Sequence, residues 1–147
     1  MGGVGNEVVA RHIQLFQALG LVRMFGDRAY PTVAGLLLVG RETALVRHVP
    51  TAKSSFQVLE GTEVRLNVET SLSLLAVFEK FEQYFSAQNP SREVERGLFR
   101  LSIADYDGRA FREALANVFA HRDYTILRPT RFPMGTEGQT ISHPGGF

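Results

Sequence analysis

A carboxylate and an amide that could form a polar site, Glu113 and Asn117, lie four positions apart in the stretch 112–124. Four positions are about one turn of an α-helix, so the two side chains lie one above the other. Ala116 and Ala120 flank this pair, and His121 lies at its C-terminal end. The small alanines leave space for another molecule to approach. A carboxylate can orient or deprotonate water, and an amide oxygen can bind a hard cation.

The opposite side of the same stretch is apolar. At about 100° per residue, four large side chains share one side of a helix: Phe111, Leu115, Val118 and Phe119. The pattern therefore predicts a helix with a buried back and a polar front. Two interpretations of the front stay open: an ordinary solvated helix surface, or a site. The pattern alone favours the solvated surface.

Amphipathic segments elsewhere predict the elements that hold this helix. Helical spacing predicts helices over 6–22 and 31–40, and a third that Thr70 or Ser71 caps and that runs to about residue 87. Alternation of apolar and polar residues predicts strands over 21–25, 55–59, 63–68, 98–103, 130–134 and 139–142. The mixed segment 41–54 is predicted to be a solvated connection, and the charged residues of 92–96 are predicted to lie in a loop or at the surface.

Single residues refine these predictions. Pro31 suits the first turn of its helix, and Gly35 allows close packing there. Asp105 or Asp107 is expected to cap the helix over 112–124. Pro133 lacks a backbone N–H, so its strand is expected at an edge of the sheet or in an irregular segment.

Composition limits the class of protein. The 147 residues are 44% hydrophobic and 21% charged, which are ordinary values for a globular domain with a core. The net charge of +1 provides no basic field that would attract nucleic acid. The absence of cysteine excludes disulfides and thiol catalysis and suits a reducing, cytoplasmic compartment. The apolar run 33–39 is too short to span a membrane, so no membrane partner is expected.

Three phrases resemble the signature of one bacterial family. They are PTVAGLLLVG at 31–40, REALANVFAHRDY at 112–124 and ISHPGGF at 141–147. The family comprises transcriptional regulators related to the C-terminal part of the ATP-dependent DNA helicase RecG, and its members usually begin with a Schlafen-type AlbA domain. The resemblance implies two parts: an N-terminal helix with a winged-helix-like joint or linker over 1–30, and a RecG-related α+β domain over 31–147, truncated at its end. It also implies an excised C-terminal piece of a larger protein.

The helix over 112–124 also resembles the N-box of the gyrase, chaperone and histidine-kinase ATPases. In that class the Asn binds Mg²⁺ that bridges the nucleotide phosphates, and the Glu orients or activates the attacking water. Carried over by position, Asn117 is the Mg²⁺ ligand and Glu113 the catalytic base, with His121 at the edge of the ATP site. Mg²⁺ needs only one or two protein oxygens beside phosphates and water, so the chemistry is coherent.

The final phrase corresponds to the adenine end of such a site. The ATPase class has an Asp there, within a D-x-G-x-G box, and the RecG-related family tends to have Asn. This chain has His143, followed by Gly145 and Gly146, which would allow close backbone approach. A neutral His accepts one hydrogen bond with a geometry unlike that of a carboxylate. The resemblance therefore implies a vestigial or conditional nucleotide site.

The phrase 121–124 ends the helix. Zinc is not expected at His121, because the four histidines form no HExxH pattern and the chain has no CxxC pattern. The resemblance makes this phrase a structural turn or the edge of the site. Arg122 and Asp123 could equally form a local ion pair of little energetic value.

These observations predict an α+β fold: a mixed or antiparallel sheet covered by helices on one face, resembling an incomplete ATPase-type α/β sandwich. The leading hypothesis is a fragment of a DNA-associated transcriptional regulator, which contacts DNA through the full-length protein and carries a vestigial ATP–Mg²⁺ site. Two alternatives stay open. One is a working ATPase module of a helicase-related protein, and the other is a structural domain that forms a homo-oligomer through the Glu113 face.

Overall fold

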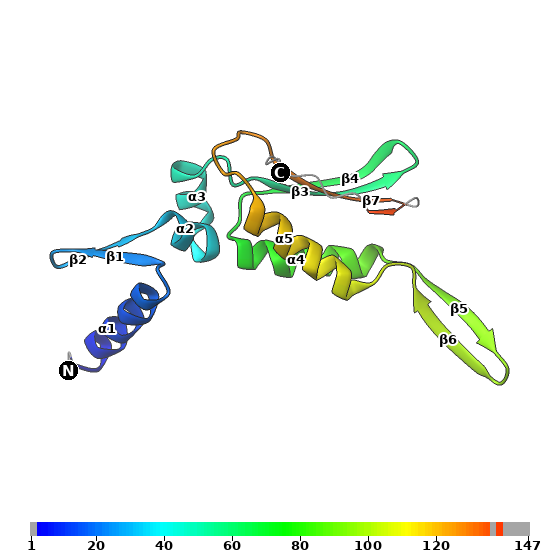
Figure 1. Cartoon of the computed structure of the whole chain (residues 1–147), viewed down its shortest axis with the longest axis horizontal. Helices are drawn as coiled ribbons and strands as arrows, with labels where there is room; N and C mark the ends of the chain where they lie inside the picture. The colour runs from blue at the N-terminus through cyan, green and yellow to red at the C-terminus, as the bar shows by residue number, and fades with distance from the viewer. Residues whose placement is uncertain (1–2, 136–137, 140–147) are drawn as a thin grey trace.

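The computed structural model describes residues 3–135 and 138–139 of the chain. Figure 1 shows a central block in which two long helices cover one face of a sheet, with further elements on either side. The fold is α+β, as predicted. Within the described residues, no helix is long and apolar enough to cross a membrane.

The central sheet is mixed. It contains β3 (Ser54–Glu60), β4 (Glu63–Thr70), β7 (Thr130–Gly135) and β8 (Gly138–Gln139), in the order β4-β3-β7-β8. Strands β3 and β4 form an antiparallel hairpin, β7 runs parallel to β3, and β8 returns antiparallel beside β7. The hairpin closes on Gly61 with φ +61°, the conformation that a tight two-residue turn requires of its first central residue.

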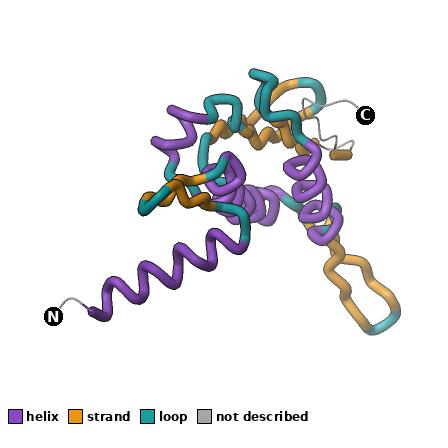
Figure 2. The backbone as a smooth tube through the Cα atoms, turned by 60° about the vertical axis from the view of Figure 1, so that its left-hand side comes forward, coloured by secondary structure: helices purple, strands orange, loops and turns teal. Residues whose placement is uncertain are grey.

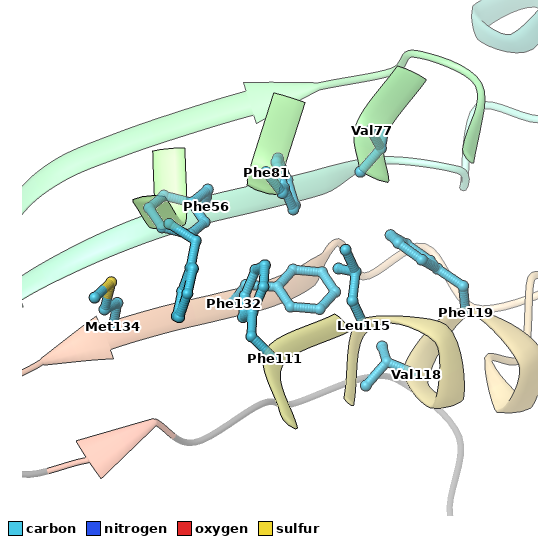
Figure 3. Packing of buried hydrophobic residues seen from close by; sticks show 10 residues of the cluster. Phe56, Val77, Phe81, Phe111, Leu115, Val118, Phe119, Phe132 and Met134 are labelled. Atoms are coloured by element: carbon cyan, nitrogen blue, oxygen red, sulfur yellow. The ribbon is translucent and has the colours of Figure 1, made fainter. Parts of the chain in front are cut away.

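Helices α4 (Leu74–Gln88) and α5 (Gly108–His121) pack against one face of this sheet (Figures 1 and 3). Phe56 of β3 and Phe132 of β7 are register partners, so their side chains point toward the helices together. Phe81 of α4 meets Phe132 edge to face, with 5.3 Å between the ring centroids. The buried side chains of this core are Phe56, Val77, Phe81, Phe85, Phe111, Leu115, Val118, Phe119, Phe132 and Met134.

The N-terminal part contains five elements: α1 (Gly3–Ala18), β1 (Val22–Phe25), β2 (Arg28–Pro31), α2 (Val33–Val39) and α3 (Glu42–His48). A second, smaller core forms here from Leu37, Leu45, Val49 and Ala52. Gly35 allows close packing as predicted, since a Cβ at this position would lie 2.1 Å from the carbonyl oxygen of Leu21. Most apolar side chains of α1, such as Val8 and Leu15, are exposed.

A separate hairpin, β5 (Ser91–Arg96) and β6 (Phe99–Ala104), connects α4 to α5 and projects away from the central block (Figures 1 and 2). The predicted alternation of strand 98–103 is confirmed, but this strand does not join the central sheet.

The two predicted loops are wrong, because both segments form regular structure, although the charged side chains at 92, 93 and 95 lie at the surface as predicted. Segment 41–54 contains α3, whose Leu45 is fully buried in the second core. The acidic Glu42 in the first turn of α3 and Arg47 in its last turn also match the helix dipole. Segment 92–96 lies in β5, where pairing with β6 outweighs a composition dominated by charge.

Several predicted boundaries also change. Pro31 ends β2, and the helix begins after Thr32, whose hydroxyl caps it by accepting a hydrogen bond from the Gly35 N–H at 3.0 Å. Thr70 belongs to β4, so α4 starts later than expected, at Leu74. Strand β7 is internal rather than at an edge. Pro133 is tolerated because β8 pairs with β7 only at the next two positions, so the missing N–H has no required acceptor among the described residues.

Candidate functional site

Helix α5 is held in one rotational orientation by its two ends and its back. At its start, Oδ1 of Asp107 accepts hydrogen bonds from the backbone N–H groups of Arg109 at 2.7 Å and Ala110 at 3.4 Å. The four predicted apolar residues of its back, Phe111, Leu115, Val118 and Phe119, are all buried. The predicted orientation of this helix is therefore confirmed, and of the two predicted caps, Asp105 and Asp107, it is Asp107 that caps the helix.

The front of α5 faces solvent. Glu113, Ala116, Asn117, Ala120 and His121 are all exposed. Glu113 and Asn117 make no hydrogen bond or ion pair with any residue that the structure describes. Their carboxylate and amide are therefore available to an external group. The structure brings together these members of the predicted site as one exposed surface, the α5 front.

Arg109 extends the α5 front by one turn. It precedes Glu113 by four residues, as Glu113 precedes Asn117, and its side chain is exposed. This cation is not among the predicted site residues, although the repeated spacing of four indicates it. An arginine at this place adds a positive charge that suits an anionic ligand. Arg112 points elsewhere, because its Nη1 lies 2.7 Å from Oε1 of Glu82 on α4.

The three residues that follow α5, Arg122, Asp123 and Tyr124, hold a structural turn. Arg122 is buried, and its guanidinium donates to the carbonyl oxygens of Lys53 at 2.9 Å, Arg128 at 3.0 Å and Thr51. Burial lowers the pKa of Arg122, because the charged form is desolvated. Arg122 thus ties the segment after α5 to the residues that precede β3.

The alternative of an Arg122–Asp123 ion pair is wrong. Asp123 instead accepts hydrogen bonds from the Thr125 hydroxyl at 2.7 Å and the Thr125 N–H at 2.8 Å. These hydrogen bonds, the one from the hydroxyl foremost, lower the pKa of Asp123. Tyr124 packs its ring 5.0 Å from the Arg122 guanidinium carbon, and burial raises the pKa of its phenol against the opposing effect of the Arg122 charge.

A cavity of about 310 Å³ lies away from the α5 front. Its apolar wall includes Val58 and Met134 of the sheet, and its polar rim includes Gln88 at the end of α4. Arg92 and Asp105 close one side, with 2.7 Å between the arginine Nε and the aspartate Oδ1. The cavity therefore lies at the base of the β5–β6 hairpin, before the start of α5, and neither Glu113 nor Asn117 lines it.

The predicted adenine end, His143, Gly145 and Gly146, lies outside the described residues. Among the residues that are described, no three metal-ligating side chains of His, Cys, Asp or Glu cluster together. A Mg²⁺–nucleotide complex requires no such cluster, because phosphates and waters supply most of its ligands. An exposed, unpartnered amide such as that of Asn117 fits the role of its one protein ligand.

Comparison with known proteins bears on the fold. No protein-family model matches the chain. No curated protein matches it either. Among solved structures, the chain is similar to the DIP2311 protein from Corynebacterium diphtheriae, with a TM-score of 0.71 and 20% sequence identity. The similarity covers 91% of this chain and 26% of that protein, so the chain spans about a quarter of the length of its structural relative. The two proteins share a fold over the matched region.

Proposed function

We propose that this chain is a nucleotide-responsive piece of a cytoplasmic, DNA-associated bacterial transcriptional regulator, and that the α5 front is its ATP–Mg²⁺ site. The observation that carries the proposal is the pair Glu113 and Asn117: both are exposed, both lack partners among the described residues, and small alanines flank them. The small side chains of the alanines leave room for a ligand beside this pair.

The residues of the α5 front divide the chemistry among them. Asn117 supplies an amide oxygen of the hard type that Mg²⁺ accepts. The Glu113 carboxylate, with no competing hydrogen bond, has its acceptor oxygens available to orient a water molecule. Arg109 adds a positive charge at the N-terminal end of the pair. Bound Mg²⁺ would neutralise phosphate charge, which is the main requirement of phosphoryl transfer. We propose binding as the retained activity and turnover as vestigial.

Contact with DNA is assigned to the full-length protein. The net charge of +1 provides little electrostatic attraction to the phosphate backbone. Arg11, Arg23 and Arg28 are exposed on the N-terminal elements, and we favour a linking role for this part. Retardation of duplex DNA by this chain at low salt, lost steeply as salt rises, would instead assign DNA contact to the chain itself.

The test is a titration of the chain with ATP and Mg²⁺, followed by backbone amide chemical shifts. We expect shifts to cluster on residues 109–121 in the parent chain and to disappear in Asn117→Ala. The matched control is Gln83→Ala, which removes an exposed amide from α4 instead of α5. If Asn117→Ala binds as tightly as the parent, or if the parent shows no shifts, the proposal fails. ATP turnover that is lost in Glu113→Gln would convert the proposal into the alternative of a working ATPase.

A further inference from the structure

The β5–β6 hairpin is an arm that the other described residues leave uncovered. Every side chain described from Ser91 to Ala104 is exposed. Leu98 at its tip and Phe99 beside it are 101% and 73% exposed. An isolated two-stranded hairpin is marginally stable in water at best, because it has no second layer to bury its apolar face. Uncovered apolar side chains that gather on such an arm indicate an interaction surface.

The two faces of this hairpin differ sharply. The cross-strand register places Val94 opposite Leu101 and Glu95 opposite Arg100. One face, the apolar face, is formed by Val94, Phe99, Leu101 and Ile103, with the positions of Arg92 and Arg96 on its β5 side. The other is charged, with Arg100 lying 3.1 Å from Glu95 and 4.0 Å from Glu93. The charged face satisfies itself within one chain, whereas the apolar face does not.

We propose that two copies of the chain associate through the free edge of β6, forming a continuous four-stranded antiparallel sheet in the order β5-β6-β6-β5. Two-fold symmetry requires the same surface on both copies. Centred on Leu101, the pairing places Leu101 opposite the partner's Leu101 and Phe99 opposite the partner's Ile103. The apolar face then doubles in area, and Arg100 lies opposite the partner's Ser102.

Charge selects this edge and this register. Antiparallel strands place side chains of the same face opposite each other, so pairing β5 with itself would bring Glu93 or Glu95 against a glutamate of the partner. Centring β6 on Arg100 would bring two arginines together. Centring it on Ser102 would move Phe99 out of the paired strands. The Leu101 register alone keeps all three apolar residues of β6 paired without opposing like charges.

The arm does not suit nucleic acid. The segment 91–104 contains three arginines and two glutamates. Arg92 pairs with Asp105, and Arg100 pairs with the glutamates of β5, so two of these arginines are already neutralised within the chain. A nucleic-acid surface requires unpaired cations for the phosphates. A second copy of the chain, which offers a matching apolar face, is the occupant that the observations favour.

The first test uses a disulfide at the symmetry axis. The chain has no cysteine, so Leu101→Cys introduces a single thiol. In the two-residue hairpin the closing pair Arg96–Phe99 exchanges backbone hydrogen bonds, and by alternation Leu101 directs its own backbone groups toward β5. Leu101 and the partner's Leu101 then form a non-hydrogen-bonded pair with Cα atoms about 4.5 Å apart, within disulfide range. We expect most of Leu101→Cys to cross-link on mild oxidation.

The matched control is Ile103→Cys, on the same face and strand. The proposed register places it opposite the partner's Phe99, so we expect at least about tenfold less cross-linking than for Leu101→Cys. Equal cross-linking of the two variants, or none in Leu101→Cys, would overturn the register.

The second test uses charge. Ser102→Arg places an arginine opposite Glu93 of its own hairpin, which does not weaken the arm, but opposite Arg100 of the partner. The repulsion occurs twice across the two-fold axis, so we expect the dimer dissociation constant to rise about tenfold. Glu93→Gln is the control, because it changes the net charge equally but lies on β5. Sedimentation equilibrium measures both. A parent chain that stays monomeric at all concentrations overturns the proposal and leaves the arm to a different macromolecule.

Discussion

The central block and the β5–β6 hairpin contain strands with the same kind of pattern but opposite surroundings. In β3, Phe56 is fully buried between the sheet and α4 (Figure 3). In β6, Phe99 stands on an equally regular apolar face and is 73% exposed. Alternation of apolar and polar residues predicts which side chains share a face of a strand. It does not predict whether another element packs on that face. Coverage depends on which other elements the topology brings near.

Different kinds of polar contact follow from this difference. In the central block, the Arg122 guanidinium is buried among backbone carbonyl groups. In the hairpin, Arg100 is 72% exposed and pairs with two exposed glutamates. A buried donor is costly to remove, because its acceptors cannot turn to water, whereas exposed ion pairs contribute little. The comparison can be tested by making the same substitution in both regions.

The largest loss of stability is expected when a phenylalanine of the core is replaced by alanine. We expect Phe81→Ala to lower the free energy of unfolding by about 3–5 kcal/mol, since it removes a fully buried ring and leaves a cavity. Phe99→Ala, its counterpart in the hairpin, should change it by about 0.5 kcal/mol or less in the monomer. Urea unfolding at low protein concentration measures both. Similar losses for the two variants would remove the distinction between the regions.

The next largest difference in stability is expected between substitutions of the buried Arg122 and the exposed Arg100. Arg122→Met should lower the free energy of unfolding by about 3 kcal/mol, because it leaves several buried carbonyl groups without a donor. Arg100→Met should lower it by about 1 kcal/mol or less, as for other exposed ion pairs. Thermal or urea unfolding provides the measurement. A loss below about 1 kcal/mol for Arg122→Met would show that its hydrogen bonds are not needed to hold the turn.

A smaller effect is expected at the junction of the two regions, where Asp107 caps α5 directly after the hairpin. Asp107→Ala should lower the free energy of unfolding by about 1 kcal/mol, since two N–H groups of the first turn lose their acceptor. Asp107→Asn keeps an acceptor oxygen and should change it by only a few tenths of this value. Amide exchange in the first turn of α5 should accelerate in the alanine variant alone, and equal acceleration in both variants would contradict the capping role.

The smallest effect is expected at the exposed edge of the central block, in the pH dependence of Asp123. Its pKa is lowered in the folded chain, so its contribution to stability is present above the pKa of the unfolded chain and disappears as the pH falls through the folded pKa. Thr125→Val should raise the pKa of Asp123, because the hydroxyl donor is lost while the backbone donor remains. Thr125→Ser should leave it low. Carboxyl carbon shifts across a pH titration report both values, and identical titration curves would exclude the hydroxyl as the cause.

Local pattern predicted α5 correctly and limited its cap to Asp105 or Asp107, because every determinant of that helix lies within a few residues. Phe111, Leu115, Val118 and Phe119 repeat at helical spacing, and Asp107 stands where a cap is needed. The loops predicted at 41–54 and 92–96 are wrong because the structure of each segment depends on contacts with elements outside it. Leu45 is buried only once α2 and the residues before β3 surround it.

The α5 front likewise combines features that local spacing predicts with features that depend on distant residues. The spacing of Glu113 and Asn117 predicts that they share one exposed side, and the structure confirms their exposure. Their role in binding a nucleotide stays a proposal. The turn at Arg122 could not be predicted from its neighbours, because the carbonyl groups that receive its hydrogen bonds include those of Lys53 and Thr51, about seventy positions earlier in the chain.

By itself, the sequence determined the short-range features of this protein: which residues share a face, where glycines permit tight turns, and which two aspartates could cap α5. Only the tertiary structure decided which faces are covered. It placed β7 parallel to β3, buried Arg122 between distant segments, and left the apolar face of the β5–β6 hairpin exposed. The physical reason is that propensity and periodicity act within one element, whereas burial requires a second surface that the chain must return to form.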